Sequence, residues 1–185
     1  MNPKRHSGSH SRECRGGREE QTVTTKTSAG PFVLADALLG AYAINNRINV
    51  YLVENLPEEA WRTKLPGAKG RDIASMVAHI HNVRLMWLKA VGVAELPPKL
   101  EPIAVTRHEA IPALEASWRA LEDVLRPALN GDGRIKGFKP DAASFFAYLV
   151  AHDAHHRGQI AMLARQLGHP VSQSVMFGMW EWSTR

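Results

Sequence analysis

The chain has 185 residues, of which 44% are hydrophobic, and it carries a formal net charge of +5. This length and composition suit one globular domain with a sizeable core. The single cysteine, Cys14, excludes a disulfide framework and favours a reducing compartment. No apolar run reaches the roughly 20 residues of a membrane-spanning helix, and the polar N-terminus lacks the apolar core of a signal peptide. We therefore expect a cytoplasmic protein that does not enter the membrane.

Residues 1–30 are expected to form a disordered basic leader. They are rich in Gly, Ser, Thr and charged residues, show no apolar periodicity, and contain more Lys and Arg than Glu. A basic tail could contact nucleic acid, but this one has no aromatic residues to stack on bases. We therefore expect no nucleic-acid partner. The predicted domain division is a leader over residues 1–30 and a folded domain over residues 31–185.

Four stretches of the folded domain repeat apolar residues at steps of three and four, which is typical of amphipathic helices. They cover about residues 32–55, 72–91, 108–129 and 141–168. Asp72 is a candidate N-cap for the second stretch, and Gly168 with Pro170 behind it ends the fourth. Pro112 fits only the first turn of a helix, which places the start of the third near that residue. The sequence therefore predicts an all-α protein with four long helices.

The connection over residues 93–107 indicates how these helices are ordered in space. It contains Pro97, Pro98 and Pro102, and it is longer than the two to eight residues that join antiparallel neighbours in a bundle. Such a connection can run the length of the bundle, so that the second and third helices are roughly parallel. The prediction is an up-down-down-up four-helix bundle. The apolar tail over residues 171–185 is expected to pack on the bundle or on a partner.

The fourth helix carries an unusual group of histidines. At about 100° per residue, His152 and His156 fall in the middle of the apolar stripe that should face the core, one turn apart, and His155 lies near its edge. The stripe consists of Phe145, Leu149, His152, His156, Ile160, Leu163 and Leu167. Asp153 points to the other side of the helix, where an exposed ion pair with Arg157 is expected. Arginines that could bind an anionic substrate, Arg84, Arg157 and Arg165, are expected to be solvated by default.

Two imidazoles that face a bundle interior indicate a metal site. Zinc, nickel and iron accept neutral imidazole, and a third ligand would come from His79 or His81 on the second helix. These two flank the apolar face of that helix on opposite sides, and periodicity does not choose between them. Three protein ligands would leave coordination positions open, as in catalytic sites, and Gln159 could hydrogen-bond a ligand. The alternative is that core hydrogen bonds satisfy the histidines without a metal.

Tryptophans are the remaining residues of interest in the folded domain. Trp61, Trp87, Trp118, Trp180 and Trp182 are expected to anchor the core or an interface. Of these, Trp87 and the C-terminal pair are the candidates for the wall of a pocket.

Residues 75–80 (SMVAHI) and 152–160 (HDAHHRGQI) resemble the DinB-like superfamily, which includes DinB and YfiT-type proteins. The resemblance covers roughly residues 32–170. It implies an up-down-down-up four-helix bundle with a metal site formed by His79, His152 and His156, and it leaves His155 as a neighbour. The metal of the family varies among zinc, nickel and iron, and homodimers are common in it.

This resemblance implies the fold more narrowly than it implies the function. Some members are thiol transferases or isomerases that use a small-molecule thiol, whose pKa the metal lowers. We therefore expect a metal-dependent enzyme, such as a thiol S-transferase or a hydrolase, that acts on a small-molecule thiol or electrophile. The alternative is a non-enzymatic metal-binding module related to stress.

Overall fold

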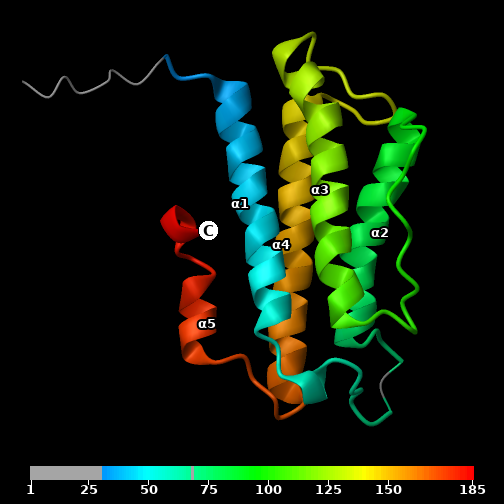
Figure 1. Ribbon diagram of the computed structural model, residues 1–185, viewed down its shortest axis with the longest axis vertical. Coiled ribbons are helices and arrows are strands. Elements are labelled where there is room, and N and C mark those ends of the chain that lie inside the picture. The colour runs from blue at the N-terminus through cyan, green and yellow to red at the C-terminus, as the bar shows by residue number, and fades with distance from the viewer. Residues whose placement is uncertain (1–30, 68) are drawn as a thin grey trace, which may run out of the picture. The chain divides into compact units, whose positions relative to one another are not determined.

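The computed structural model describes residues 31–67 and 69–185, and this part of the chain is all-α (Figure 1). The predicted leader, residues 1–30, lies outside the described residues. Four long helices form the bundle, and a short α-helix and two single 3₁₀ turns accompany them. In chain order the elements are α1 (Leu34–Glu54), η1 (Glu58–Ala60), α2 (Ile73–Val91), α3 (Arg107–Asn130), α4 (Ala142–Gln166), α5 (Gln173–Gly178) and η2 (Trp182–Thr184).

The order of the four helices is the predicted up-down-down-up arrangement. In Figure 1, α1 and α4 run in one direction, and α2 and α3 both run in the other. The connection between α2 and α3 returns along the bundle and is fastened to α2. Asn82 Nδ2 donates to the carbonyl of Leu100 at 2.8 Å, and His81 Nε2 lies 2.9 Å from the carbonyl oxygen of Pro98. These contacts hold the proline-rich connection in its extended course.

Side-chain caps fix the starts of three bundle helices. The carboxylates of Asp72 and Asp141 accept hydrogen bonds from the backbone amides of the third residues that follow them, each at 2.7 Å. Thr106 and Glu109 form a capping box at the start of α3. The expectation that Pro112 sets this start was wrong, because the capping box begins the helix at Arg107 and leaves Pro112 inside it. A proline there removes one helical hydrogen bond, which the packing of α3 tolerates.

The bundle core has two apolar halves with a polar layer between them. One half includes Leu52, Ile73, Val77 and Leu114, and the other includes Leu39, Leu88, Leu121 and Phe145. Between these two apolar halves, each helix contributes polar side chains that are as buried as the apolar ones. These are Asn45, Asn46 and Asn49 of α1, Arg84 of α2, Ser117 of α3 and Asp153 of α4.

This polar layer overturns two sequence-based expectations. Asp153 does not form an exposed ion pair with Arg157, and Arg84 is not solvated, because both Asp153 and Arg84 are fully buried. Asp153 Oδ2 accepts hydrogen bonds from Arg84, Asn45 and Asn49 at 2.7–2.9 Å. At about 100° per residue, Asp153 lies roughly 60° round α4 from His156. Asp153 therefore faces the core, and His152 and His156 lie at the edge of the core-facing side of α4, not in its middle as expected.

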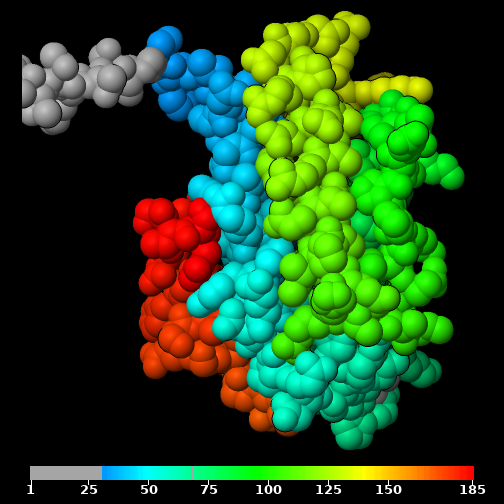
Figure 2. All heavy atoms as spheres, in the orientation of Figure 1, coloured from blue at the N-terminus to red at the C-terminus, as the bar shows by residue number. Residues whose placement is uncertain are grey.

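The C-terminal segment packs on the bundle, beside α1 (Figures 1 and 2). Arg47 of α1 donates to the carbonyl of Arg185 at 2.6 Å, and the guanidinium of Arg185 lies 3.7 Å from the ring centroid of Tyr51. Large apolar side chains nevertheless stay exposed on this segment, with Trp180 at 79%. Among the described residues, none of the helices combines the length and apolar character needed to cross a membrane.

Candidate metal centre

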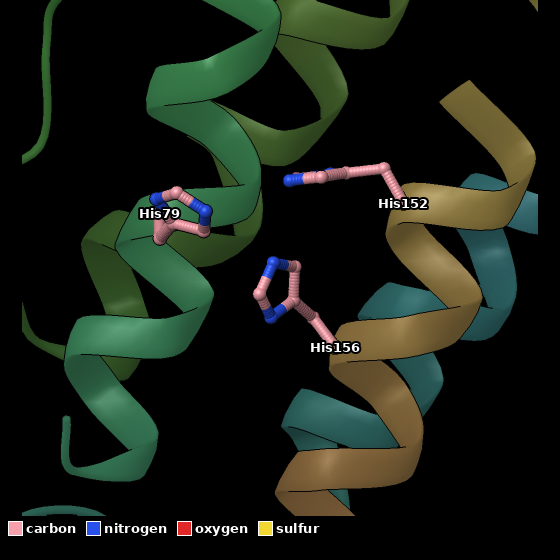
Figure 3. A group of neighbouring side chains, drawn as sticks. All are labelled: His79, His152 and His156. Atoms are coloured by element: carbon pink, nitrogen blue, oxygen red, sulfur yellow. The ribbon is translucent and has the colours of Figure 1, made fainter. Parts of the chain in front are cut away.

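Three histidines from two helices meet at one point of the bundle (Figure 3). His79 projects from α2, and His152 and His156 project from consecutive turns of α4. One nitrogen of each ring lies within 4.8 Å of a nitrogen of both others. The ring centroids are 4.6–5.4 Å apart. The packing of α2 against α4 therefore brings residues more than 70 positions apart in the sequence into one cluster.

The cluster lies at the edge of the core, where solvent can reach it. His156 is buried, at 6% exposed, whereas His79 and His152 are half-buried. The cluster therefore contacts the core through His156 and is partly exposed to solvent at His79 and His152. Water can therefore reach the two half-buried rings from that side.

The surroundings favour the neutral form of two of these imidazoles, His79 and His156. Burial lowers the pKa of His79 to about 4, with smaller contributions from the charge of Arg71 and from His156 and His152. Burial also lowers the pKa of His156, although a hydrogen bond to Gln159 opposes the shift. Neutral imidazole has the lone pair that a metal ligand needs. Both rings are therefore ready to bind a cation at neutral pH without first losing a proton.

Gln159 orients one of the three rings. Its Oε1 lies 2.8 Å from Nδ1 of His156, one turn further along α4. An amide oxygen can only accept, so Nδ1 carries the proton and Nε2 keeps its lone pair. A metal-ligating histidine is commonly held in this way by a hydrogen bond from its other nitrogen. The sequence indicated this role, since Gln159 was a candidate for a hydrogen bond to a ligand.

A carboxylate lies behind a second ring. Nδ1 of His152 is 3.8 Å from Oδ1 of Asp153, which is longer than a hydrogen bond. This Oδ1 is buried and has no hydrogen-bond partner within the described part of the chain. The polar layer of the core therefore reaches to the edge of the histidine cluster and presents a negative charge there.

The structure separates the two candidate histidines of α2. His79 faces His152 and His156, whereas His81 lies away from them, buried against the connection to α3. Its Nε2 donates to the carbonyl of Pro98. His155 is exposed on α4, and its ring centroid is 5.0 Å from that of His156, but it is not part of the cluster. The geometry therefore groups His79, His152 and His156.

An aromatic wall adjoins the cluster, and the sequence indicated only one of its members. Tyr148, one turn before His152, stacks on its ring with centroids 6.1 Å apart. Trp87 of α2 and Phe138 contact Tyr148 in turn, with centroids 5.5 and 5.7 Å away. Trp87 was predicted as a candidate for a pocket wall. Tyr148 was missed, although its four-residue spacing from His152 places it on the same side of α4.

The three nitrogens fit the requirements of one transition-metal ion. Bonds of about 2.1 Å place the ligand atoms of a tetrahedral site about 3.4 Å apart. From the observed limit of 4.8 Å, the ligand nitrogens must therefore approach one another by up to about 1.4 Å, which rotation about their side-chain bonds can supply. Neutral imidazoles suit zinc, nickel and iron, and they suit calcium or magnesium poorly. The arrangement can therefore hold a divalent transition metal with coordination positions left for other molecules.

Comparisons with known proteins agree with this fold. The model of the DinB family matches residues 32–182. A crystal structure assigned to the DinB family, from Exiguobacterium sibiricum 255-15, superposes with a TM-score of 0.55. It is 18% identical in sequence, and the match covers 79% of this chain and 99% of the other. The search among curated proteins gave no match.

Proposed function

Because the chain belongs to the DinB family, we propose that it is an enzyme that depends on one divalent transition metal bound by His79, His152 and His156. Nickel, zinc and iron are the proposed metals, and the proposed reaction is thiol S-transfer or hydrolysis. The protein is proposed to act in the cytoplasm as a homodimer, on a small-molecule thiol or electrophile.

One observation carries this proposal. Three imidazoles converge on a point that is partly exposed on one side, and no fourth histidine, cysteine or carboxylate joins the group in the described part of the chain. Structural zinc sites in proteins are usually closed by four protein ligands, whereas catalytic sites keep a position for water or substrate. The ligand set therefore supports a catalytic centre better than a structural one.

The chain's own residues would have distinct tasks in such an enzyme. A bound divalent metal supplies acidity, lowering the pKa of a coordinated thiol or water so that a nucleophile forms at neutral pH. His79, His152 and His156 hold the ion, and Gln159 fixes the tautomer of His156. Tyr148 covers one face of His152 and Trp87 packs against Tyr148, and this apolar surface can exclude water from the reacting atoms.

Cobalt substitution provides the decisive experiment, because Co²⁺ absorbs visible light in a manner that depends on its ligands. The untagged protein is loaded with one equivalent of Co²⁺, and a small thiol such as 2-mercaptoethanol is added. We expect a new thiolate-to-cobalt absorption band in the wild type and none in His152→Ala. A cobalt spectrum that does not respond to thiol or to azide would contradict open coordination positions.

Turnover is then measured with a thiol and 1-chloro-2,4-dinitrobenzene. In that reaction the thiol loses its proton, the sulfur bonds to the ring carbon, and chloride leaves with its electron pair. We expect metal-dependent turnover that His152→Ala abolishes and His155→Ala keeps. Hydrolysis of an activated ester is measured in parallel, with the same variants. If metal binds but neither reaction responds to it, the non-enzymatic metal-binding module is the better description.

A further inference from the structure

A cavity lies on the other side of α4 from the histidines. It is a cavity of about 230 Å³ between α4, α1 and the C-terminal segment. Its α4 side consists of Ala154, Gly158 and Ala161, and the C-terminal segment contributes Met176, Trp180 and Trp182. At about 100° per residue, the α4 residues of the cavity lie roughly opposite His152 and His156. The cavity is therefore a separate site from the metal centre.

Small side chains of α4 create this hollow. Ala154, Gly158 and Ala161 follow at steps of four and three, so they share one face of the helix. A Cβ atom placed on Gly158 would meet no other atom within 4 Å. Larger residues at these positions would fill the space under the two tryptophans. The cavity therefore exists because the residues on this face of α4 have small side chains or none.

One cationic side chain, Arg157, reaches this otherwise apolar cavity. Nη1 of Arg157 donates to Asn49 Oδ1 at 2.7 Å, which is its one hydrogen bond among the described residues. The neighbouring buried carboxylate, Asp153, is bound instead by Arg84 at 2.7 Å. The carboxylate of Asp153 is thus paired with Arg84, and the described residues place no acidic group within ion-pair distance of Arg157.

This imbalance of charge indicates what the cavity would bind. A cation that is largely withdrawn from water is costly unless a negative charge compensates it. An anion beside Arg157 would supply that charge, and the tryptophan and methionine side chains offer apolar surface for the rest of the same molecule. A fully apolar ligand would leave Arg157 uncompensated, and an inorganic anion would leave the apolar surface exposed.

We propose that the cavity between α4 and the C-terminal segment binds an amphipathic organic anion, with its acid group beside Arg157 and its apolar body between Gly158 and Trp180. The site is distinct from the metal centre and does not depend on the proposed enzymatic activity. The class of ligand is a carboxylate, or a comparable acid, that carries an aliphatic or aromatic body.

Isothermal titration calorimetry with octanoate as the probe tests this proposal. The full chain is titrated with octanoate and with 1-octanol, which has the same apolar body but no charge. We expect one octanoate to bind per chain, and octanol to bind at least about tenfold more weakly. Equal affinities for the two molecules, or no heat from octanoate at millimolar concentration, would overturn the proposal.

Two variants locate the binding. Gly158→Met fills the cavity, and methionine favours a helix more than glycine does, so the fold should persist. We expect Gly158→Met to remove octanoate binding and Gly40→Met to keep it, because Gly40 is exposed on α1 and also has open space around it. Wild-type affinity in Gly158→Met would place the binding elsewhere and overturn the proposal.

Arg157→Gln tests the charge while keeping a donor for Asn49. We expect it to weaken octanoate binding about tenfold and to leave octanol binding unchanged. An equal loss for both molecules would contradict a role of the charge. If Arg157→Gln does not fold, the comparison of octanoate with octanol in Gly158→Met and the wild type decides the same question.

Discussion

Arg84 and Asp153 form a fully buried ion pair in the middle of the bundle, where Nη2 of Arg84 donates to Oδ2 of Asp153 at 2.7 Å. Their side chains are 0% and 1% exposed. Burial alone would raise the pKa of Asp153, but Arg84, with hydrogen bonds from its other neighbours, holds this pKa below its usual range. The pair joins α2 to α4, which are the two helices that carry the histidine cluster.

Removal of one partner from this pair is expected to destabilise the fold strongly. Asp153→Ala would leave Arg84 buried without a counter-charge, which costs about 3–5 kcal/mol of unfolding free energy. Urea denaturation followed by circular dichroism measures this. Asp36→Ala is the matched control, because Asp36 pairs with Arg126 at the surface, and its loss should cost less than about 1 kcal/mol. Similar costs for both variants would show that the buried pair contributes no more than a surface pair.

Metal content should depend on three histidines and not on their neighbours. His79→Ala, His152→Ala and His156→Ala are each expected to lose stoichiometric metal, because two imidazoles hold an ion much more weakly than three. His155→Ala should retain it, since His155 is exposed and outside the cluster. Elemental analysis of untagged protein, purified without a metal column, measures the ratio of metal to chain. Full metal content in any of the three variants would remove that residue from the site.

Gln159 should tune the affinity of the metal without being a ligand. Gln159→Leu removes the acceptor that holds Nδ1 of His156, and changes of this kind typically weaken metal binding about 10- to 100-fold. Competition with a chromophoric chelator measures the dissociation constant. Gln166→Leu, at an exposed position near the end of α4, should leave it unchanged. An unchanged affinity in Gln159→Leu would mean that the hydrogen bond does not orient the ligand.

Removal of the metal should lower stability through mass action. A ligand that binds only the folded state stabilises it by about 2.7 kcal/mol at a free concentration 100 times its dissociation constant. Thermal unfolding with and without a chelator measures this difference. The melting temperature of His152→Ala should not respond to the chelator, because this variant lacks a complete site. A wild type that melts at the same temperature in both conditions would contradict binding of metal to the folded state.

The helices and most of their ends could be predicted from the sequence, because apolar periodicity and capping depend on residues close together in the chain. The spacing of apolar residues predicted the four long helices to within a few residues of their ends. Asp72 was recognisable as an N-cap, and the proline-rich connection predicted the up-down-down-up order. The four-residue spacing of His152 and His156 fixed these rings on one side of α4 whatever the helix packs against. The start of α3 predicted from Pro112 was wrong, because a capping box earlier in the sequence begins this helix.

Which polar residues are buried, and which partners they meet, became clear only from the tertiary structure. Asp153 was assigned to the surface because its four-residue spacing from Arg157 suggested an exposed ion pair, yet its partners lie 69 to 108 residues away on α2 and α1. Likewise, periodicity left His79 and His81 equivalent, and only the way in which α2 packs on α4 turns His79 towards the other two rings. The sequence by itself therefore determined which residues share a face of each helix. The packing of the helices decided which of those faces meet, because that depends on contacts between residues distant in the chain.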